Sequence, residues 1–203
     1  MSNLVGVVDY GVAGNIPSIT KALVTAGADV TIVKNAAQLE QVDKIVLPGV
    51  GSFSDAMVEL QKSGLMTALK EHVTIKPTLG ICLGMQILAK VGFEYGESEG
   101  LGVFNGEVRP VICHGQVPHM GFNNINVLNG TPLLNGLENE AFYFMHSFEV
   151  VNYTDVIALT DYCGHTFVSA INKGMTYGVQ FHPEKSREAG IQLFRNFIAL
   201  EMN

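Results

Sequence analysis

Cys82 stands between two glycines in the stretch TLGICLG, which begins at Thr78, where an apolar run gives way to a helical pattern. An apolar strand, a Gly-x-Cys-x-Gly turn and a helix form the cysteine version of the nucleophile elbow, a tight turn that displays its central side chain. We expect a Cβ at Gly80 or Gly84 to crowd the adjoining strand and helix. The helix N-terminus favours a thiolate, and the N–H of Leu83 would point toward a developing oxyanion. Taken alone, these residues nevertheless favour a buried structural cysteine.

His182 and Glu184 offer the base that a cysteine nucleophile needs. They lie in the stretch QFHPEK, directly after an apolar run at 177–181 that predicts a strand. Residues i and i+2 of an extended chain share a side, and Pro183 restricts the backbone around them. Glu184 can therefore reach the imidazole and fix its tautomer. A capping histidine beside a solvated glutamate is the alternative, and these residues alone favour it.

The glycine-rich loop Pro48-Gly49-Val50-Gly51 also follows a predicted strand. Glycines there would let backbone N–H groups approach a ligand and complete an oxyanion hole, although an ordinary turn between a strand and a helix fits equally well. Parallel strands bring their C-terminal ends to one edge of a sheet, where such sites form. The elbow, the histidine and the loop would meet at that edge, so together they favour an active site over coincidence.

The first half of the chain alternates predicted strands with predicted helices. Apolar residues recur at helical spacing over 16–26, where Asn15 can cap the start and Gly27 can end the helix. The alternation indicates βαβ units and an α/β fold with a doubly wound, mostly parallel sheet flanked by helices. The predicted strands are 4–8, 29–33, 44–47, 78–81 and 177–181, and the predicted helices are 16–26, 55–60, 65–72, 82 to about 90, and 186–202.

The second half of the chain follows a different pattern. From about residue 100 to residue 178, short apolar segments separated by turns predict a largely antiparallel insertion or extension. These segments are GEVRPV, NINVLN, AFYFMHSFEV, VIALT and FVSAIN. Neither a repeat, a low-complexity stretch nor a linker interrupts the sequence, so we expect residues 1–203 to form a single domain.

Composition argues against several classes of protein. Of the 203 residues, 47% are hydrophobic and 15% are charged, and the formal net charge is −7. Because the chain has neither a dense basic run nor an apolar run of about 18 residues, we expect no nucleic-acid partner and no membrane span. Cys82, Cys113 and Cys163 are widely spaced and match no metal-binding pattern. We therefore expect reduced thiols in a cytoplasm, no metal and no other cofactor.

Longer motifs resemble a known family. PGVGSF, GICLGMQ and YGVQFHPEKS resemble the class I, triad-type glutamine amidotransferases. VDYGVAGNIPSI, LPGVGSFSDAM, VPHMGFN, FYFMHSF and HPEKSREAG are similar to the glutaminase subunits of imidazole glycerol phosphate synthases, from Val8 to about Phe197. The loop has PGVGS rather than the PGGES typical of glutaminases in pyridoxal phosphate synthesis, which argues against that related group.

The resemblance implies a flavodoxin-like fold with an antiparallel side sheet, and hydrolysis of glutamine to glutamate and ammonia. The ammonia would pass to a (βα)8-barrel cyclase subunit within a heterodimer. There it would join a phosphoribulosyl substrate, giving imidazole glycerol phosphate and an aminoimidazole carboxamide ribotide in histidine biosynthesis.

The resemblance also implies roles for individual residues. Cys82 would attack the glutamine carboxamide, His182 would move the protons, and Glu184 would orient His182. The oxyanion hole is expected from Val50, Gly51 and Leu83, and the glutamine site from Gly49, Gln86, Glu94, Tyr143, His146 and Ser147. The face toward the partner and the route of the ammonia are expected from Asn15, His119, Met120, Phe122, Asn123 and Lys185, for which plain surface polarity is the alternative.

One position departs from the family pattern. Phe122 stands where the family commonly has a tryptophan at the partner interface, and the chain has no tryptophan. Phenylalanine keeps an apolar anchor but lacks the indole donor. A paralogous glutaminase subunit of a sugar amidotransferase in surface polysaccharide synthesis therefore remains an alternative.

Two further classes are weighed against the motifs. A cysteine peptidase or chaperone-like hydrolase would share the elbow, but it would need neither VPHMG nor PGVG. A non-catalytic binding subunit would be expected to have lost part of the set Cys82, His182 and Glu184, which is intact here.

Overall fold

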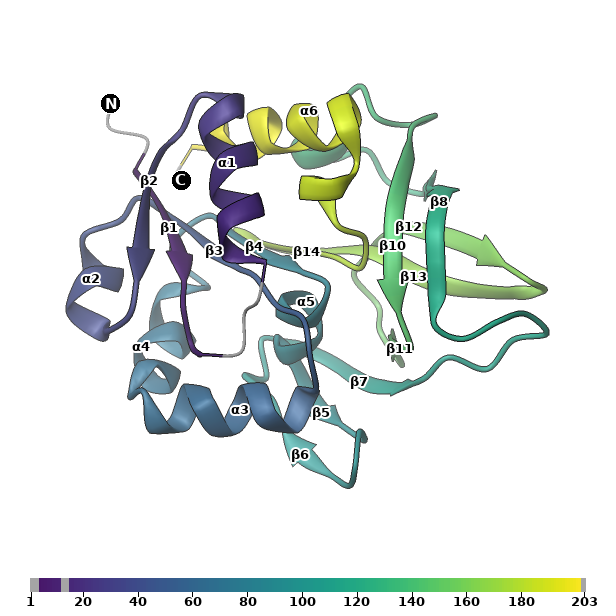
Figure 1. The fold of residues 1–203 in the computed structure, drawn as a ribbon, viewed down its shortest axis with the longest axis horizontal. Helices are drawn as coiled ribbons and strands as arrows, with labels where there is room; N and C mark the ends of the chain where they lie inside the picture. The colour runs from purple at the N-terminus through teal and green to yellow at the C-terminus, as the bar shows by residue number, and fades with distance from the viewer. Residues whose placement is uncertain (1–3, 12–14, 202–203) are drawn as a thin grey trace.

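An eight-stranded sheet forms the centre of the computed structural model, which describes residues 4–11 and 15–201. Its strand order is β2-β1-β3-β4-β14-β13-β12-β9, parallel from β2 to β14 and antiparallel beyond (Figure 1). The strands are β1 (Leu4–Val8), β2 (Asp29–Val33), β3 (Lys44–Leu47), β4 (Thr78–Ile81), β9 (Asn126–Val127), β12 (Val156–Tyr162), β13 (His165–Lys173) and β14 (Thr176–Val179). The predicted doubly wound α/β fold is confirmed.

Local signals explain where several helices begin and end. Ser52 accepts a hydrogen bond from the N–H of Asp55, so α3 begins at Phe53, two residues before the expected start. Gly27 ends α1 with a left-handed φ of 103°, as expected. Asn15 precedes α1, but its side chain makes no capping bond, so that expectation is wrong. The helices are α1 (Ile16–Ala26), α2 (Ala36–Glu40), α3 (Phe53–Lys62), α4 (Leu65–His72), α5 (Leu83–Ile87) and α6 (Arg187–Ile198), with 3-10 turns at η1 (Pro132–Leu134) and η2 (Pro183–Lys185).

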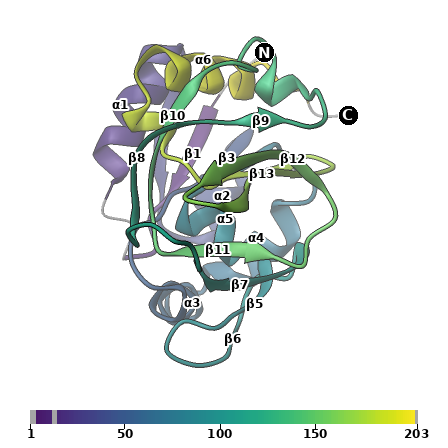
Figure 2. The ribbon, with the colours of Figure 1, turned by 90° about the vertical axis from the view of Figure 1, so that its right-hand side faces the viewer.

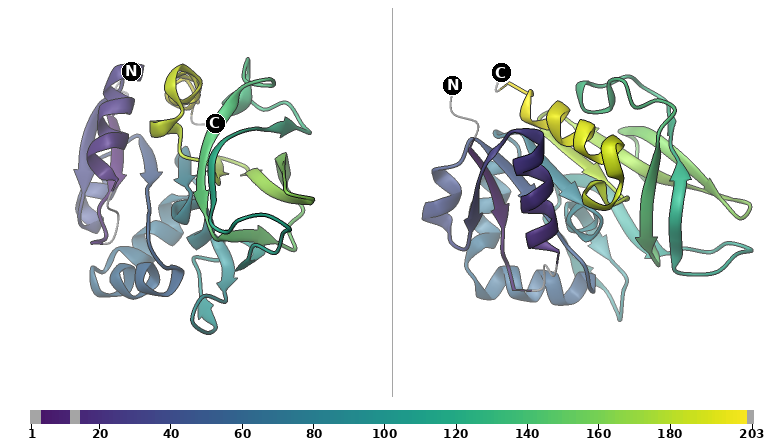
Figure 3. Two further views of the ribbon diagram at one scale, coloured as in Figure 1. Left: turned by 45° about the vertical axis from the view of Figure 1, so that its right-hand side comes forward. Right: turned by 45° about the horizontal axis from the view of Figure 1, so that its top comes forward.

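Helices cover both faces of the parallel half of the sheet. α1 and α6 pack side by side on one face, while α2 to α5 lie on the other (Figures 1 and 3). In β1, Val5 and Val7 join the core under α1 and α6, whereas Val8 joins the core under α3 and α4. Both faces of the strand are therefore buried, which explains its continuous apolar sequence.

Smaller sheets replace the helices over the antiparallel half. Within the described residues, β10 (Ala141–His146) pairs antiparallel with β8 (His119–Asn124). A second sheet has the order β11-β7-β5-β6, formed by Phe148–Val151, Phe104–Pro110, Ala89–Gly92 and Ser98–Glu99. Figure 2 shows both layers around β12 and β13. The expected antiparallel region is thus present, but it extends the central sheet and also contributes two layers that pack against it.

The helix after the elbow is shorter than the sequence predicts. α5 ends at Ile87 rather than near Lys90. The carbonyl of Ile87 accepts a hydrogen bond from the N–H of Leu101 at 2.8 Å, and that of Leu88 accepts one from Val103 at 2.9 Å. These carbonyls bind a distant segment instead of continuing the helix, and the chain proceeds as β5.

Other boundaries also differ from the sequence-based ranges. AFYFMHSFEV was expected to be one strand, but it divides at Ser147 into β10 and β11, which belong to different sheets. β14 ends at Val179, before Phe181. α6 ends at Ile198, and Met202, which was expected in this helix, lies outside the described residues. No described helix has the length and apolar character needed to cross a bilayer.

Candidate active site

Three candidate segments meet at one edge of the central sheet because β3, β4 and β14 are neighbours. The loop 48–51 follows β3, Cys82 follows β4, and His182 comes shortly after β14. Ile81 pairs with Val179, whose carbonyl accepts a hydrogen bond from the N–H of Cys82 at 2.8 Å. The ends of β4 and β14 are therefore level, and their following residues reach the same place.

Cys82 occupies a strained turn. Its φ is 52° and its ψ is −108°, outside the regions that residues with a side chain ordinarily adopt. A Cβ on Gly84 would lie 1.8 Å from the carbonyl oxygen of Leu47, and one on Gly80 would lie 2.6 Å from that of Gly84. The crowding expected at both glycines is present, and the turn places the thiol at the start of α5.

His182 and Glu184 form a buried pair. Nδ1 of His182 lies 2.8 Å from Oε1 of Glu184, and both side chains are wholly buried. Asn15, expected to face a partner, instead donates from Nδ2 to the same oxygen at 2.7 Å. The N–H of His182 donates to the carbonyl of Tyr143, and the hydroxyl of Ser186 donates to the carbonyl of His182. The imidazole is therefore fixed from its side chain and its backbone.

Charge pairing outweighs burial at this pair. Burial alone would lower the pKa of His182, but the nearby Cys82 thiol and the hydrogen bond and charge of Glu184 raise it from 6.5 to about 10. Burial alone would raise the pKa of Glu184, but its bonds to His182 and Asn15 hold it below 4.5. A protonated His182 beside the Glu184 carboxylate is therefore the favoured arrangement at neutral pH.

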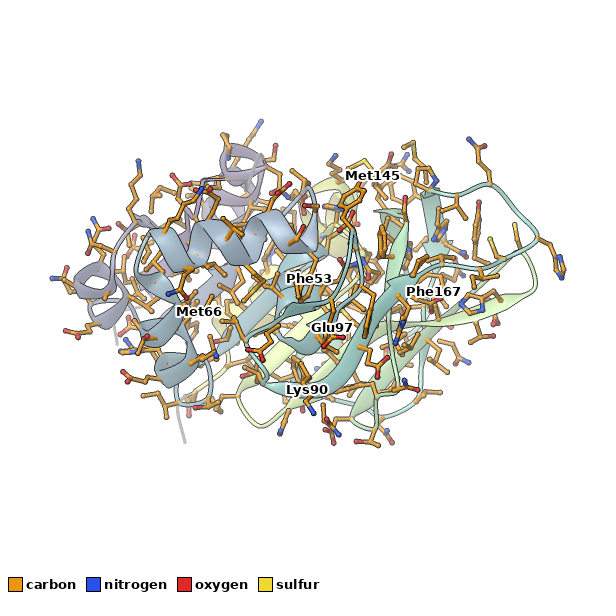
Figure 4. All side chains as sticks on the ribbon, turned by 90° about the horizontal axis from the view of Figure 1, so that it is seen from below. Phe53, Met66, Lys90, Glu97, Met145 and Phe167 are labelled. Atoms are coloured by element: carbon orange, nitrogen blue, oxygen red, sulfur yellow. The ribbon has the colours of Figure 1, made fainter. Side chains whose placement is uncertain are left out.

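A cavity of about 330 Å³ borders the cysteine. The sulfur of Cys82 accepts a hydrogen bond from Nε2 of Gln180 at 3.5 Å and lies 3.8 Å from the carbonyl oxygen of Met145. Nε2 of His182 is buried and has no hydrogen-bond partner within the described part of the chain. In Figure 4, seen from below, Phe53 lies near the middle of the view and Met145 lies above it, toward the upper edge.

The loop after β3 is clamped at its start. A Cβ on Gly49 would lie 2.6 Å from the hydroxyl of Tyr10 and 2.8 Å from Cβ of Leu83. The same hydroxyl donates to the carbonyl of Pro48. Gly51 has a φ of 117°, and a Cβ there would meet nothing within 4 Å. Gly49 therefore has no room for a side chain, whereas Gly51 is required by its positive φ rather than by lack of space.

Most residues expected to bind glutamine or its oxyanion line the cavity. Glu94 accepts a hydrogen bond from the N–H of Phe53 at 2.7 Å, which ties its carboxylate to the start of α3. Gly49 and Tyr143 do not line it, because Gly49 packs against Tyr10 and Leu83, and the ring centre of Tyr143 lies 5.5 Å from that of Phe122. The expected residues that do line it are Val50, Gly51, Leu83, Gln86, Glu94, His146 and Ser147.

The side chains of β8 alternate between two directions. Met120 and Phe122 are 58% and 44% exposed, whereas His119 is only 2% exposed. Asn123 turns toward β12 and donates to the carbonyl of Asp161 at 2.9 Å. His119 therefore does not share the outward face of Met120 and Phe122, as the two-residue period of a strand requires, whereas the assignment of Asn123 to the partner interface stays a prediction.

Gln180 is a site residue that the sequence analysis missed. It is fully buried and bonds both Cys82 and Gln86. A usable signal was present, because a polar residue closes an apolar strand at the edge where the site was expected. Its position two residues before His182 would also place both side chains on one side of an extended chain.

A family model described as glutamine amidotransferase class-I matches residues 7–200. The chain belongs to the class I glutamine amidotransferase family. The elbow, the His182–Glu184 pair and the cavity are thus features of a glutamine amidotransferase chain, and their geometry suits a cysteine nucleophile beside an acid–base histidine.

Similar proteins cover almost all of this amidotransferase chain. Imidazole glycerol phosphate synthase subunit HisH 1 of Campylobacter jejuni strain RM1221 is 43% identical, over 97% of this chain and 100% of that protein. Subunit HisH of Aquifex aeolicus is 41% identical over 94% of both. The fold is similar to a crystal structure described as glutamine amidotransferase (TM-score 0.76, 20% identity, 97% and 99% covered) and to PurLQS of Thermotoga maritima (TM-score 0.73, 22% identity, 97% and 98% covered).

Proposed function

We propose that this chain is the glutaminase subunit of an imidazole glycerol phosphate synthase and acts in histidine biosynthesis. The observation that carries the proposal is the strained Cys82 beside a cavity, with the charged pair of His182 and Glu184 at the same sheet edge. Relatives about 40% identical over nearly the whole chain carry the name of that subunit, which supports the choice among glutamine amidotransferases.

The first half of the reaction forms a thioester. The Cys82 thiolate attacks the carboxamide carbon of glutamine, and the N–H groups of Leu83 and of Val50 or Gly51 stabilise the negative oxygen. The first N–H groups of a helix lack partners within it, which leaves that of Leu83 available. The protonated Nε2 of His182 then gives its proton to the departing nitrogen, and ammonia leaves.

The second half of the reaction releases glutamate. Neutral His182 takes a proton from a water molecule, which attacks the thioester carbonyl, and the Cys82 thiolate departs. Glu184 holds Nδ1 of His182 throughout, so Nε2 always faces the reacting atoms. One glutamine and one water thus give one glutamate and one ammonia, with the histidine returned to its protonated state.

An exposed surface near the site is the proposed contact with a (βα)8-barrel cyclase. The guanidinium of Arg187 lies 4.6 Å from the ring centre of Phe122, and the ammonium of Lys185 lies 5.8 Å from that of Tyr143. Met120 extends the same outward face of β8. Aromatic, methionine and arginine side chains are enriched at protein interfaces, and both cations are carried by the segment that follows His182.

We expect Phe122→Ala to weaken association with the cyclase about thirtyfold, because a central aromatic anchor contributes about 2 kcal/mol or more. The melting temperature of the isolated chain should change little, since Phe122 is 44% exposed and its ring contacts Tyr143 and Arg187 at the surface. Titration calorimetry and thermal unfolding measure the two quantities. Ile75→Ala, at a 62% exposed turn after α4, is the matched control. Unchanged affinity, or a large fall in melting temperature, would contradict the interface assignment.

We expect glutaminase activity of the chain alone to be low, and to rise at least about tenfold when the partner and its ligand are present. The proposed reason is the loop after β3, where the glycines at 49 and 51 allow the Val50–Gly51 peptide to turn its N–H toward or away from the cavity at small steric cost. Glutamate release, measured with and without the co-purifying partner, tests this. Full activity of the chain by itself would rule out gating by the loop.

A sugar amidotransferase in surface polysaccharide synthesis is the second candidate, favoured only by Phe122 at a position where the family commonly has tryptophan. The partner decides between the two. The protein that co-purifies with this chain should be supplied with glutamine and, in separate reactions, the phosphoribulosyl precursor or an activated sugar. Formation of imidazole glycerol phosphate supports the first function, and amination of the sugar replaces it with the second.

A further inference from the structure

A chain of hydrogen bonds runs from His119, outside the cavity, to the sulfur of Cys82. Nδ1 of His119 lies 3.2 Å from Nε2 of His146, whose Nδ1 lies 2.8 Å from the carbonyl oxygen of Phe148. The same carbonyl accepts a bond from Nε2 of Gln86 at 3.1 Å. Gln86 also donates to Oε1 of Gln180 at 3.0 Å, and Nε2 of Gln180 donates to the Cys82 sulfur at 3.5 Å.

The carbonyl of Phe148 determines the direction of every bond in this chain. A carbonyl oxygen only accepts, so Nδ1 of His146 must carry a proton. In a neutral ring, Nε2 of His146 is then an acceptor, and Nδ1 of His119 must donate to it. On the other side, both protons of the Gln86 amide are used, one on Phe148 and one on Gln180. One arrangement of protons therefore satisfies all of these groups.

The surroundings of both histidines favour the neutral rings that this arrangement needs. His119 is stacked between Tyr162 and Phe144, with ring centres 3.9 Å and 4.9 Å away. Burial lowers the pKa of His119, and burial together with the neighbouring histidines lowers that of His146 to about 4. Neither ring carries a charge at neutral pH.

We propose that His119 is a positioning residue for the glutamine site. By donating to His146 it fixes the tautomer that holds the carbonyl of Phe148, and so the turn at Ser147 between β10 and β11 that forms one wall of the cavity. Gln86 and Gln180 extend the same chain to the nucleophile. This inference rests on the proposed function, because it assigns glutamine to that cavity.

Two substitutions separate the hydrogen bond of His119 from its packing. His119→Phe keeps an aromatic ring between Tyr162 and Phe144 but removes the donor. His119→Asn loses the stacked ring but keeps an N–H at the position of Nδ1. His114→Phe is the matched control, because His114 is exposed and outside the chain of bonds.

The glutamine analogue 6-diazo-5-oxo-L-norleucine, which alkylates the cysteine of glutamine sites, is the probe. We expect His119→Phe to raise the concentration of this analogue that gives half-maximal inactivation about tenfold. The reason is that Nε2 of His146, a buried acceptor, is then left without a donor. The maximal inactivation rate should fall no more than about twofold, because the sulfur lies at the far end of the chain of bonds. His119→Asn should restore saturation to within about twofold of the unchanged protein, and the control should match it.

Nitrogen-15 NMR of the unchanged full chain provides a test that needs no variant to fold. Both His119 and His146 should be neutral and protonated at Nδ1. Protonation of His146 at Nε2 would overturn the proposal. An equal loss of saturation by the analogue in His119→Phe and His119→Asn would also overturn the proposal, because something other than the hydrogen bond would then be lost in both. So would a His119→Phe variant that saturates like the unchanged protein. Failure of the unchanged chain, with its partner present, to hydrolyse glutamine would instead refute the proposed function, whatever the tautomers are.

Discussion

Cys82→Ala should abolish glutamine-dependent synthesis, lowering glutamine hydrolysis by at least about a thousandfold, while the complex still forms product from added ammonium salt. The Cys82 sulfur is the protein atom that bonds covalently to glutamine in the proposed mechanism, whereas use of ammonia belongs to the partner. Alanine should also be tolerated structurally, because Cys82 is small and its strained backbone is held by the neighbouring glycines. Glutamate release and product formation from each nitrogen source are the two measurements.

The other two cysteines are matched controls for this prediction. Cys113 lies in a partly exposed loop and Cys163 at the exposed turn between β12 and β13, and neither borders the cavity. Cys113→Ala and Cys163→Ala should therefore leave hydrolysis close to that of the unchanged protein. Near-normal hydrolysis by the Cys82 variant, or a comparable loss in either control, would show that the nucleophile is wrongly assigned.

Glu184→Gln should lower the rate of glutamine hydrolysis about a hundredfold or more, with a much smaller effect on KM. Glutamine has the same shape and can still accept bonds from His182 and Asn15 through its Oε1. It removes the negative charge that stabilises the imidazolium, and it places an amide where Oε2 of Glu184 is buried without a partner. Steady-state kinetics in the presence of the partner would measure both parameters.

The same variant has a distinct pH signature in its stability. The lowered pKa of Glu184 contributes stability that is fully present above pH 4.5. This stability is lost as the pH falls through the pKa of Glu184 in the folded state. The raised pKa of His182 contributes stability below 6.5 that is lost as pH rises toward about 10. The difference in unfolding free energy between the unchanged protein and Glu184→Gln should therefore be largest between pH 4.5 and 6.5.

Glu188→Gln is the control for both measurements. Glu188 lies on the next turn, is 79% exposed, and pairs only with Arg195 on the surface of α6. Exposed ion pairs contribute little, so this variant should behave as the unchanged protein at every pH. A loss of activity equal to that of Glu184→Gln, or a stability difference that does not vary with pH, would remove the charged pair from the mechanism.

Local sequence patterns predicted most of the parallel half of the fold, although they missed α2 and misplaced ends of α3, α5 and β14. β1, β2, β3, β4, α1 and α4 have the bounds that periodicity and turn residues predict. The same reasoning located the three strand ends that meet at the site, and it identified Gly80 and Gly84 as positions where a Cβ would collide. These features depend on short stretches of chain, whose apolar spacing and glycines are visible in the sequence itself.

Tertiary structure decided the rest, because each remaining feature depends on a partner distant in the chain. α5 stops where Leu101 and Val103 take its carbonyls, and Asn15 gives up a capping bond for the carboxylate of Glu184. The resemblance placed His119 at the face toward the partner and the ammonia route, yet its side chain is buried and bonds His146. The sequence by itself thus determined which residues stand at the ends of strands. Only the packing of β8, β10 and α6 against those strands decided which side chains face the cavity, since a polar group turns toward whichever buried partner the fold brings within hydrogen-bond distance.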